Sequence, residues 1–127
     1  MGSVETERKK ILDGSYSSRV IRGKQRKHIE GTREFEQNRL KMQQISSGSE
    51  PSILNVDAQE LVDNYKGKGT VKRHRGSLYP SEIIDADMII GKTWVKSKRM
   101  YVETKRAMIV YSSDGVHVVP ISDYKKR

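Results

Sequence analysis

Two histidines, His28 and His117, are the residues of this sequence best suited to proton transfer near neutral pH. Cleaving RNA without a metal requires a base for the 2′-hydroxyl proton, an acid for the leaving 5′-oxygen, and cations that stabilise the charge on the phosphorane. An imidazole suits both proton-transfer roles because its pKa lies near neutrality. His28 lies among Lys24, Arg26 and Lys27, which favour its neutral, base-competent form. These residue types therefore indicate chemistry on a phosphodiester.

The second histidine lies in an expected β-hairpin. Asp114-Gly115 between alternating hydrophobic residues is a strong signal for a two-residue turn. With that turn, Ser112 faces His117 across the two strands, whereas a three-residue loop places Tyr111 opposite the histidine. In either register a hydroxyl would orient the imidazole on a rigid sheet.

Each of these residues also has an interpretation without catalysis. His28 could be an exposed histidine in a basic loop, and His117 could occupy the polar face of a half-buried strand. His74, in Lys-Arg-His-Arg, has the pattern of surface charge or of a phosphate contact. Trp94 and Tyr101 could stack on bases or belong to the core. Three further polar side chains, two acids able to act as base and one hydroxyl able to meet a phosphate, are Glu30, Glu103 and Thr104.

The charge of the chain indicates a polyanionic partner. Its 127 residues include 25 Lys and Arg against 16 Asp and Glu, a formal net charge of +9. The basic residues cluster at 8–27, 66–75 and 92–106. An excess of this size favours nucleic acid over a surface that is basic only for solubility.

Other classes of site are excluded or disfavoured by composition. With no cysteine there is no disulfide, no thiolate nucleophile and no cysteine zinc site. The three histidines lack metal-ligand spacing, so neither a metal nor a cofactor is expected. No apolar run approaches the ~18 residues of a membrane span, and no basic segment has a wide apolar helical face, so no membrane partner is expected.

Helices are expected in the first half of the chain. Residues 5–13 can form a short helix that stops at Gly14, and residues 32–45 are rich in helix formers. The clearest helix spans 57–66, with Asp57 as N-cap, Glu60 in the first turn and Gly67 at the C-cap. Residues 15–31 are expected to be mostly irregular, and 46–51 to be a loop.

After Gly69 the hydrophobic pattern changes to the period of strands. Five strands are expected, at 82–90, 93–96, 100–103, 107–112 and 116–119. They should form one continuous antiparallel meander with the 57–66 helix packed on one face. The fold class is thus α+β, with N-terminal helices on a C-terminal antiparallel sheet. We expect a basic, partly flexible arm at 1–19 and a domain at 20–124.

Several motifs together resemble a known family. Gly-Lys-Gln-Arg-Lys-His-Ile-Glu-Gly-Thr (23–32), Ser-Ile-Leu (52–54), Asp-Ala-Gln-Glu-Leu-Val-Asp-Asn-Tyr-Lys-Gly-Lys-Gly (57–69), Ile-Gly (90–91), Thr104 and Tyr-Ser-Ser-Asp-Gly-Val-His-Val-Val-Pro (111–120) are similar to the bacterial polymorphic toxin type 50 domain. The similarity spans roughly residues 20–120, in order. The paired Lys-His-Ile and His-Val-Val-Pro elements make it specific.

The resemblance implies a ribonuclease fold of the barnase–EndoU–colicin–RelE superfamily, with helices packed on an antiparallel sheet. Such domains occur at the C-termini of secreted toxins and of phage head or portal proteins. The polar positions shared by the family fall on Lys24, Gln25, Lys27, His28, Thr32, Thr104, Tyr111, Ser112 and His117. Many relatives carry a histidine where this chain has Val110, so one candidate catalytic group is missing here.

Residues and resemblance together predict a metal-independent endoribonuclease that leaves a 2′,3′-cyclic phosphate and a 5′-hydroxyl. His28 and His117 should approach each other and share the acid and base roles. Stabilisation of the phosphorane is assigned to Lys24 and Lys27, and orientation of phosphate or imidazole to Thr104, Tyr111 and Ser112. The residues expected to contact RNA elsewhere are Arg22, Gln25, Arg26, Thr32, Lys105 and Arg106.

The expected partners are RNA and a cognate immunity protein. The expected location is the cytoplasm of a target or host bacterium, reached by secretion or in a phage particle. The alternative is a nucleic-acid-binding or phage structural module without catalysis, in which the same basic surface holds nucleic acid and the histidines are structural.

Overall fold

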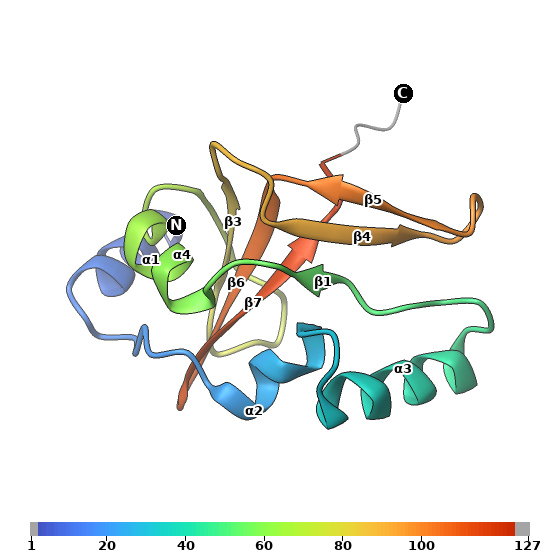
Figure 1. Ribbon diagram of the computed structural model, residues 1–127. Helices are drawn as coiled ribbons and strands as arrows, with labels where there is room; N and C mark the ends of the chain where they lie inside the picture. The colour runs from blue at the N-terminus through green and yellow to red at the C-terminus, as the bar shows by residue number, and fades with distance from the viewer. Residues whose placement is uncertain (1–2, 124–127) are drawn as a thin grey trace.

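The structure is a computed structural model that describes residues 3–123 (Figure 1). The helices are α1 (Ser3–Leu12), α2 (Arg22–Gln25), the 3-10 turn η1 (Arg26–His28), α3 (Arg33–Ile45) and α4 (Ala58–Tyr65). The strands are β1 (Ile53–Leu54), β2 (Thr70–Lys72), β3 (Ser81–Asp85), β4 (Gly91–Val95), β5 (Met100–Thr104), β6 (Arg106–Ser112) and β7 (Gly115–Ile121). The α+β class with helices before strands is confirmed.

Helix α4 begins at the N-cap that was predicted for it, and α3 begins one residue after the start of the predicted helix. The Thr32 hydroxyl accepts a hydrogen bond from the Phe35 amide at 3.0 Å at the start of α3. The Asp57 carboxylate accepts one from the Glu60 amide at 3.0 Å at the start of α4. Gly67, with φ +79°, follows the end of α4. Among residues 3–123, none of the helices has the length and apolar character needed to cross a bilayer.

Helices α2 and η1, and strands β1 and β2, were not predicted. These elements have only two to four residues each, too few to show a hydrophobic period. Their conformation depends on contacts with the rest of the domain. They matter for the site, because α2 and η1 carry Lys24, Lys27 and His28.

The strands form two sheets, so the prediction of one continuous meander is wrong. The larger sheet has the order β2-β3-β6-β7 and the smaller one β1-β4-β5, all antiparallel. The β4-β5 hairpin leaves the larger sheet and pairs with β1 (Figure 1). Glycine is required at Gly91 because a Cβ there would lie 2.1 Å from the Ile53 carbonyl oxygen. Because β4 and β5 lie in the smaller sheet, β3 pairs directly with β6 in the larger one.

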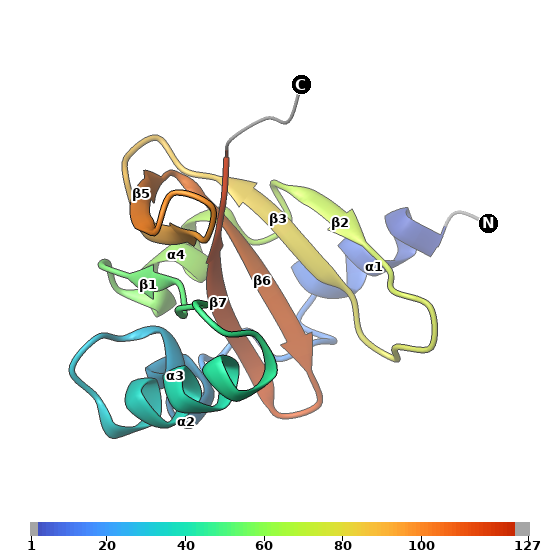
Figure 2. The same ribbon diagram turned by 90° about the vertical axis from the view of Figure 1, so that its right-hand side faces the viewer.

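One face of the larger sheet is buried under α1 and α4. Residues that alternate along the strands fill this face, namely Val71, Glu82, Ile84, Ala107, Ile109, Tyr111, Val116 and Val118. Leu61 and Val62 of α4 belong to the same core, and Tyr65 packs against it, so α4 covers one face of the sheet as predicted. Figure 2 looks onto the opposite face, and residues 3–123 place no helix in front of β3 and β6 there.

Helix α1, within the predicted basic arm at 1–19, packs on the core of the domain. Ile11 of α1 is 1% exposed and lies in the core. Glu7 is equally buried and accepts hydrogen bonds from Tyr16 and Arg73. The sequence pattern did not predict this packing, because glutamate is usually a surface residue and nothing near Glu7 in sequence indicates its buried partners.

The outer edge of β7 is covered by residues 19–25. The Val116 amide donates to the Arg19 carbonyl at 2.9 Å, and the Ile21 amide donates to the Val116 carbonyl at 2.8 Å. The Gln25 side chain continues this pairing, since its amide oxygen accepts from Val118 N at 2.7 Å and its nitrogen donates to Val118 O at 2.9 Å. Gln25 is therefore part of the sheet edge, and its predicted contact with nucleic acid does not fit a side chain that is 3% exposed.

Replacing Gln25 with alanine is expected to lower the free energy of unfolding by about 2–4 kcal/mol. The change leaves the buried amide and carbonyl of Val118 without partners, and each unsatisfied group costs about 1–3 kcal/mol. Urea unfolding followed by circular dichroism measures the loss. Gln37→Ala, at an exposed position of α3, is the matched control and should change stability little. Equal stability of the two variants would show that Gln25 does not hold the edge.

Candidate active site

His117 lies on the uncovered face of the larger sheet, opposite Val110. Val116 and Val118, its neighbours on β7, point into the core, so strand alternation turns His117 to the other side. The predicted registers are wrong, because Ser112 pairs with Gly115 and the turn consists of Ser113 and Asp114.

The physical reason lies in Gly115. A Cβ at this position would lie 2.3 Å from the Arg19 carbonyl oxygen. The glycine therefore serves the close approach of residues 19–21 to β7, with φ +143°, and does not sit in the turn itself. The Asp-Gly signal located the hairpin correctly but placed the two-residue turn one residue too far along the chain, so the partner of His117 is Val110 and not Ser112.

His28 ends η1 and is held by the residue that precedes β1. Its Nδ1 atom lies 3.1 Å from both the carbonyl oxygen and the hydroxyl of Ser52. With Nδ1 occupied in this way, Nε2 is the nitrogen left to meet a substrate. Burial is the main reason that the pKa of His28 lies below its usual range, and Lys27 lowers it further.

His28 and His117 form one electrostatic unit with two lysines. Burial first, and then the neighbouring His28, Lys24 and Lys27, together lower the pKa of His117 to about 4. Three residues from α2 and η1 that the sequence assigns to the site, His28, Lys24 and Lys27, thus lie within electrostatic reach of His117 on β7. At neutral pH both imidazoles are uncharged, the form in which a ring can accept a proton.

Tyr111 lies on the other face of the sheet from His117. Its side chain is 3% exposed, and its hydroxyl donates to the Glu82 carboxylate at 3.0 Å. Burial, then the neighbouring Glu82 charge and this hydrogen bond, raise the pKa of Tyr111. The predicted orienting role does not fit this placement, because neighbouring residues of a strand point to opposite faces and Tyr111 and Val110 are neighbours.

The other two predicted hydroxyls are also used within the fold. Thr104 is 1% exposed, donates to the Ile121 carbonyl at 2.6 Å and accepts from the Arg106 amide at 3.1 Å. Ser112 donates to the Gly115 carbonyl at 2.9 Å, beside the hairpin turn. Thr104 therefore ties the end of β5 to β7, and its hydroxyl does not face a phosphate as predicted.

The residues predicted to contact RNA are dispersed. Thr32 caps α3, and Arg106 pairs with Asp85 at 2.8 Å, beside exposed Lys105. Arg22 and Arg26 line a cavity of about 740 Å³ between α2 and the start of α4. This cavity contains neither histidine.

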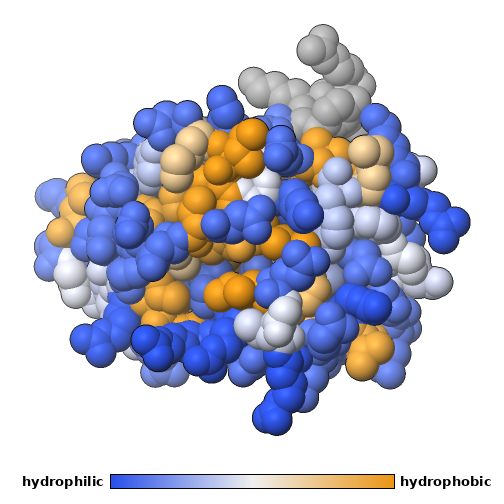
Figure 3. Space-filling model, viewed as in Figure 1, coloured by the Kyte–Doolittle hydropathy of each residue, from blue (hydrophilic) through white to orange (hydrophobic). Residues whose placement is uncertain are grey.

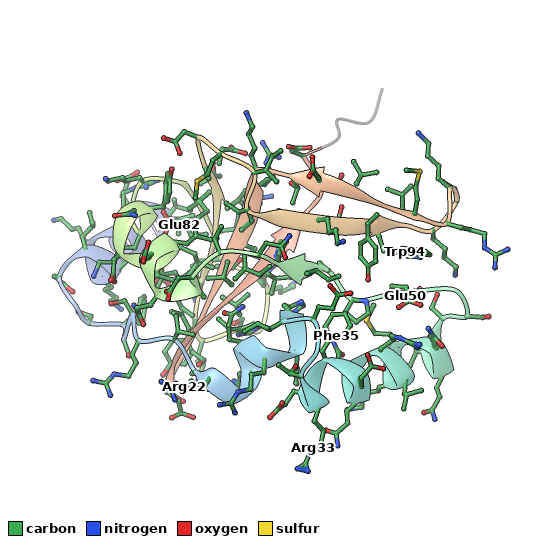
Figure 4. All side chains as sticks on the ribbon, viewed as in Figure 1. Arg22, Arg33, Phe35, Glu50, Glu82 and Trp94 are labelled. Carbon is green, nitrogen blue, oxygen red and sulfur yellow. The ribbon has the colours of Figure 1, made fainter. Side chains whose placement is uncertain are left out.

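The surface around this cavity has both apolar and basic side chains. Figure 3 shows apolar side chains in the middle of this view, surrounded by hydrophilic ones. Figure 4 shows Arg22 directed away from the body of the domain in the same view. Arg19, which also lines the cavity, is exposed as well. The arginines thus extend the positive surface beyond the two histidines.

Trp94 and Tyr101 support the site from β4 and β5. Their rings meet edge to face with centroids 5.0 Å apart. Trp94 Nε1 donates to the Gly48 carbonyl at 2.7 Å, and the Tyr101 hydroxyl donates to the Pro51 carbonyl at 3.0 Å. Both rings hold the segment between α3 and β1, which carries the Ser52 that orients His28. Sequence reasoning missed Ser52, because nothing local links it to a histidine 24 residues earlier.

Comparison with known proteins agrees with the motifs. Residues 20–120 match the family described as bacterial toxin 50. No curated protein and no solved structure matches the chain. The matched region includes both histidines, both lysines and the hairpin that carries His117.

Proposed function

The chain belongs to the bacterial toxin 50 family, and on this premise we propose that it is a metal-independent endoribonuclease toxin domain. One observation carries the proposal: two partly buried imidazoles have lowered pKa values and interact electrostatically, His117 with Lys24 and Lys27 and His28 with Lys27, on a protein of net charge +9. The charge favours a polyanionic substrate. The imidazoles supply proton transfer where a phosphate would be attracted.

In the proposed reaction, neutral His117 takes the proton of a ribose 2′-hydroxyl. The 2′-oxygen attacks phosphorus, the bond from phosphorus to the 5′-oxygen breaks, and His28 gives a proton to that oxygen. A bound phosphate raises the pKa of both rings, which lets His28 carry this proton. Lys24 and Lys27 stabilise the negative charge on the phosphorane. The products are a 2′,3′-cyclic phosphate and a 5′-hydroxyl.

Incubation with end-labelled single-stranded RNA in excess EDTA tests the proposal. We expect cleavage to continue, because proton transfer and charge stabilisation come from side chains. Polynucleotide kinase should label the new 5′ ends without prior dephosphorylation, as a 5′-hydroxyl requires. DNA of the same sequence, lacking the 2′-hydroxyl, is the matched control and should stay intact. Cleavage of both, or of neither, would contradict the proposal.

The rival functions are nucleic-acid binding without catalysis and a structural role in a phage particle. Both predict intact RNA in the same assay. Salt dependence alone cannot separate binder from enzyme, because counterion release drives both.

The proposed activity also defines the partner and the place of action. Polymorphic toxin domains usually pair with immunity proteins. We propose that this one acts on RNA in the cytoplasm of a target or host bacterium. An inhibitor that covers the cluster of His28, His117, Lys24 and Lys27 would have to be acidic there, since its surface must complement these lysines.

A further inference from the structure

The row of residues that contains His117 crosses the whole uncovered face of the larger sheet. Lys72 pairs with Ser81, Ser81 with Val110, and Val110 with His117. Residues directly opposite each other point to the same face, so all four belong to one surface. Adjacent strands lie about 4.8 Å apart, so the row from β7 to β2 spans about 14 Å.

The far end of this row carries a second imidazole. The Nε2 atom of His74 lies 2.8 Å from the Ser81 hydroxyl, which places the ring over the Ser81 end of the row. Ser81 itself is 2% exposed, whereas His74 is exposed. The serine hydroxyl thus fixes Nε2 of an imidazole that faces solvent, and Nδ1 is left to meet a ligand.

The loop that carries His74 is anchored on both sides. The Ser77 amide donates to the His74 carbonyl at 3.0 Å, closing a turn in which Gly76 has φ +80°. Arg73 is tied to the buried Glu7 carboxylate. Arg75 therefore lies at the tip of a turn whose base is held by α1. Among residues 3–123, neither Lys72 nor Arg75 forms an ion pair, so both charges are available to a phosphate.

A row of aliphatic side chains runs beside the polar row. Ile83 pairs with Met108, and Met108 pairs with Val119, on the same uncovered face. All three are only half-buried. Figure 2 shows the surface formed by these strands, bounded at one side by the loop between β2 and β3 and at the other by α3 and the β4-β5 hairpin. Basic groups at the β2 end of the first row, next to an apolar row, suit a strand with phosphates along one edge and sugars and bases along the other.

We propose that single-stranded RNA lies across this face, with Lys72, His74 and Arg75 binding backbone phosphates beyond the one cleaved at His117. The inference rests on the proposed function and deepens it, because it makes the substrate an oligonucleotide that crosses four strands. A dinucleotide reaches only the His117 end of the row. Longer substrates gain the contacts at β2.

Cleavage of substrates of two lengths tests the subsite. In the double variant Lys72→Ala/His74→Ala, we expect kcat/KM for a ribohexanucleotide to fall about tenfold or more, the effect of losing one charged hydrogen bond. For a ribodinucleotide it should stay within about twofold. Lys9→Ala is the matched control. This lysine is exposed on α1, the helix that covers the opposite face of the sheet. An equal loss on both substrates, or on neither, would overturn the subsite.

Binding measured without cleavage separates this inference from the proposed function. Fluorescence anisotropy with a 2′-deoxy hexanucleotide reports contacts with phosphates and requires no reaction. Wild type should bind with a steeper salt dependence than the double variant, by about one unit of slope for each phosphate contact removed. If wild type binds the probe but leaves RNA intact, the proposed function fails while the subsite stands. If the double variant binds as tightly as wild type, the subsite is wrong whatever the protein cleaves.

Discussion

Replacing His117 with alanine is expected to lower the rate of RNA cleavage by about 10²–10⁴. The change removes the group that accepts the 2′-hydroxyl proton and leaves the backbone pairing of β7 with β6 intact. His28→Ala should cause a loss of similar size, because Nε2 of this ring is the proposed proton donor. Single-turnover cleavage of labelled RNA measures both rates. The double variant should lose little more than either single variant, since the two rings act as a unit.

Ser112→Ala is the matched control for these variants. Its hydroxyl bonds to the Gly115 carbonyl and lies on the strand that faces β7, yet it does not stand opposite His117. We expect its activity to stay within about twofold of wild type. Both histidine variants should still bind a 2′-deoxy probe. A histidine variant with wild-type activity would remove that residue from the mechanism, and loss of probe binding would indicate a binding role instead.

The dependence of kcat/KM on pH below neutrality is a second test of His117 as the base. The pKa of His117 is lowered to about 4, so the ring stays neutral, and able to act as base, as pH falls from 7 towards that value. Because kcat/KM reports groups of the free enzyme, it should rise as pH falls below neutrality and His28, whose pKa is also lowered, becomes protonated, and the decline due to His117 should come only near pH 4. A decline centred at pH 6.5 would show a base that is neither buried nor beside cations.

The fold class, and the grouping of Lys24, Lys27 and His28, followed from local signals in the sequence. Asp57 caps α4 as predicted, and the helix formers of residues 32–45 were enough to place α3, although the cap that Thr32 provides was not predicted. Lys24, Lys27 and His28 are neighbours in sequence, and their grouping follows from one turn of helix. Their meeting with His117 required the chain to return after 89 positions, which chemistry suggested but no periodicity could show.

The parts that could not be predicted depend on long-range contacts. Gly115 follows Asp114 in a pattern typical of a turn, but glycine is required there because the Arg19 carbonyl packs against it. That displacement changed the partner of His117 from a hydroxyl to Val110. Tyr111 was assigned to the site because it neighbours Ser112 in sequence, but strand alternation sends it to Glu82 in the core. Gln25 lies in a segment with the composition of a surface loop. It is buried because its side chain pairs with Val118 at the outer edge of β7.

Glu82→Ala is expected to lower the free energy of unfolding by about 3–5 kcal/mol, the largest stability effect at a single position that the contacts support. Glu82 is completely buried beside α4 (Figure 4). Its carboxylate accepts from the amides of Gly67 at 3.0 Å and Gly69 at 2.7 Å, and from the Tyr111 hydroxyl at 3.0 Å. Alanine would leave these three donors unpaired inside the core, together with a cavity. Urea unfolding measures the loss.

Tyr111→Phe keeps this test informative if Glu82→Ala does not fold. It removes one of the three hydrogen bonds and should cost about 1–2 kcal/mol, with RNA cleavage unchanged because the hydroxyl lies on the face away from His117. Glu103→Ala, at an exposed position of β5, is the matched carboxylate control and should be close to neutral. A Tyr111→Phe variant that is stable but inactive would return the tyrosine to the catalytic site and contradict the arrangement of the two faces. A stable Glu82→Ala variant would show that the three donors find other partners.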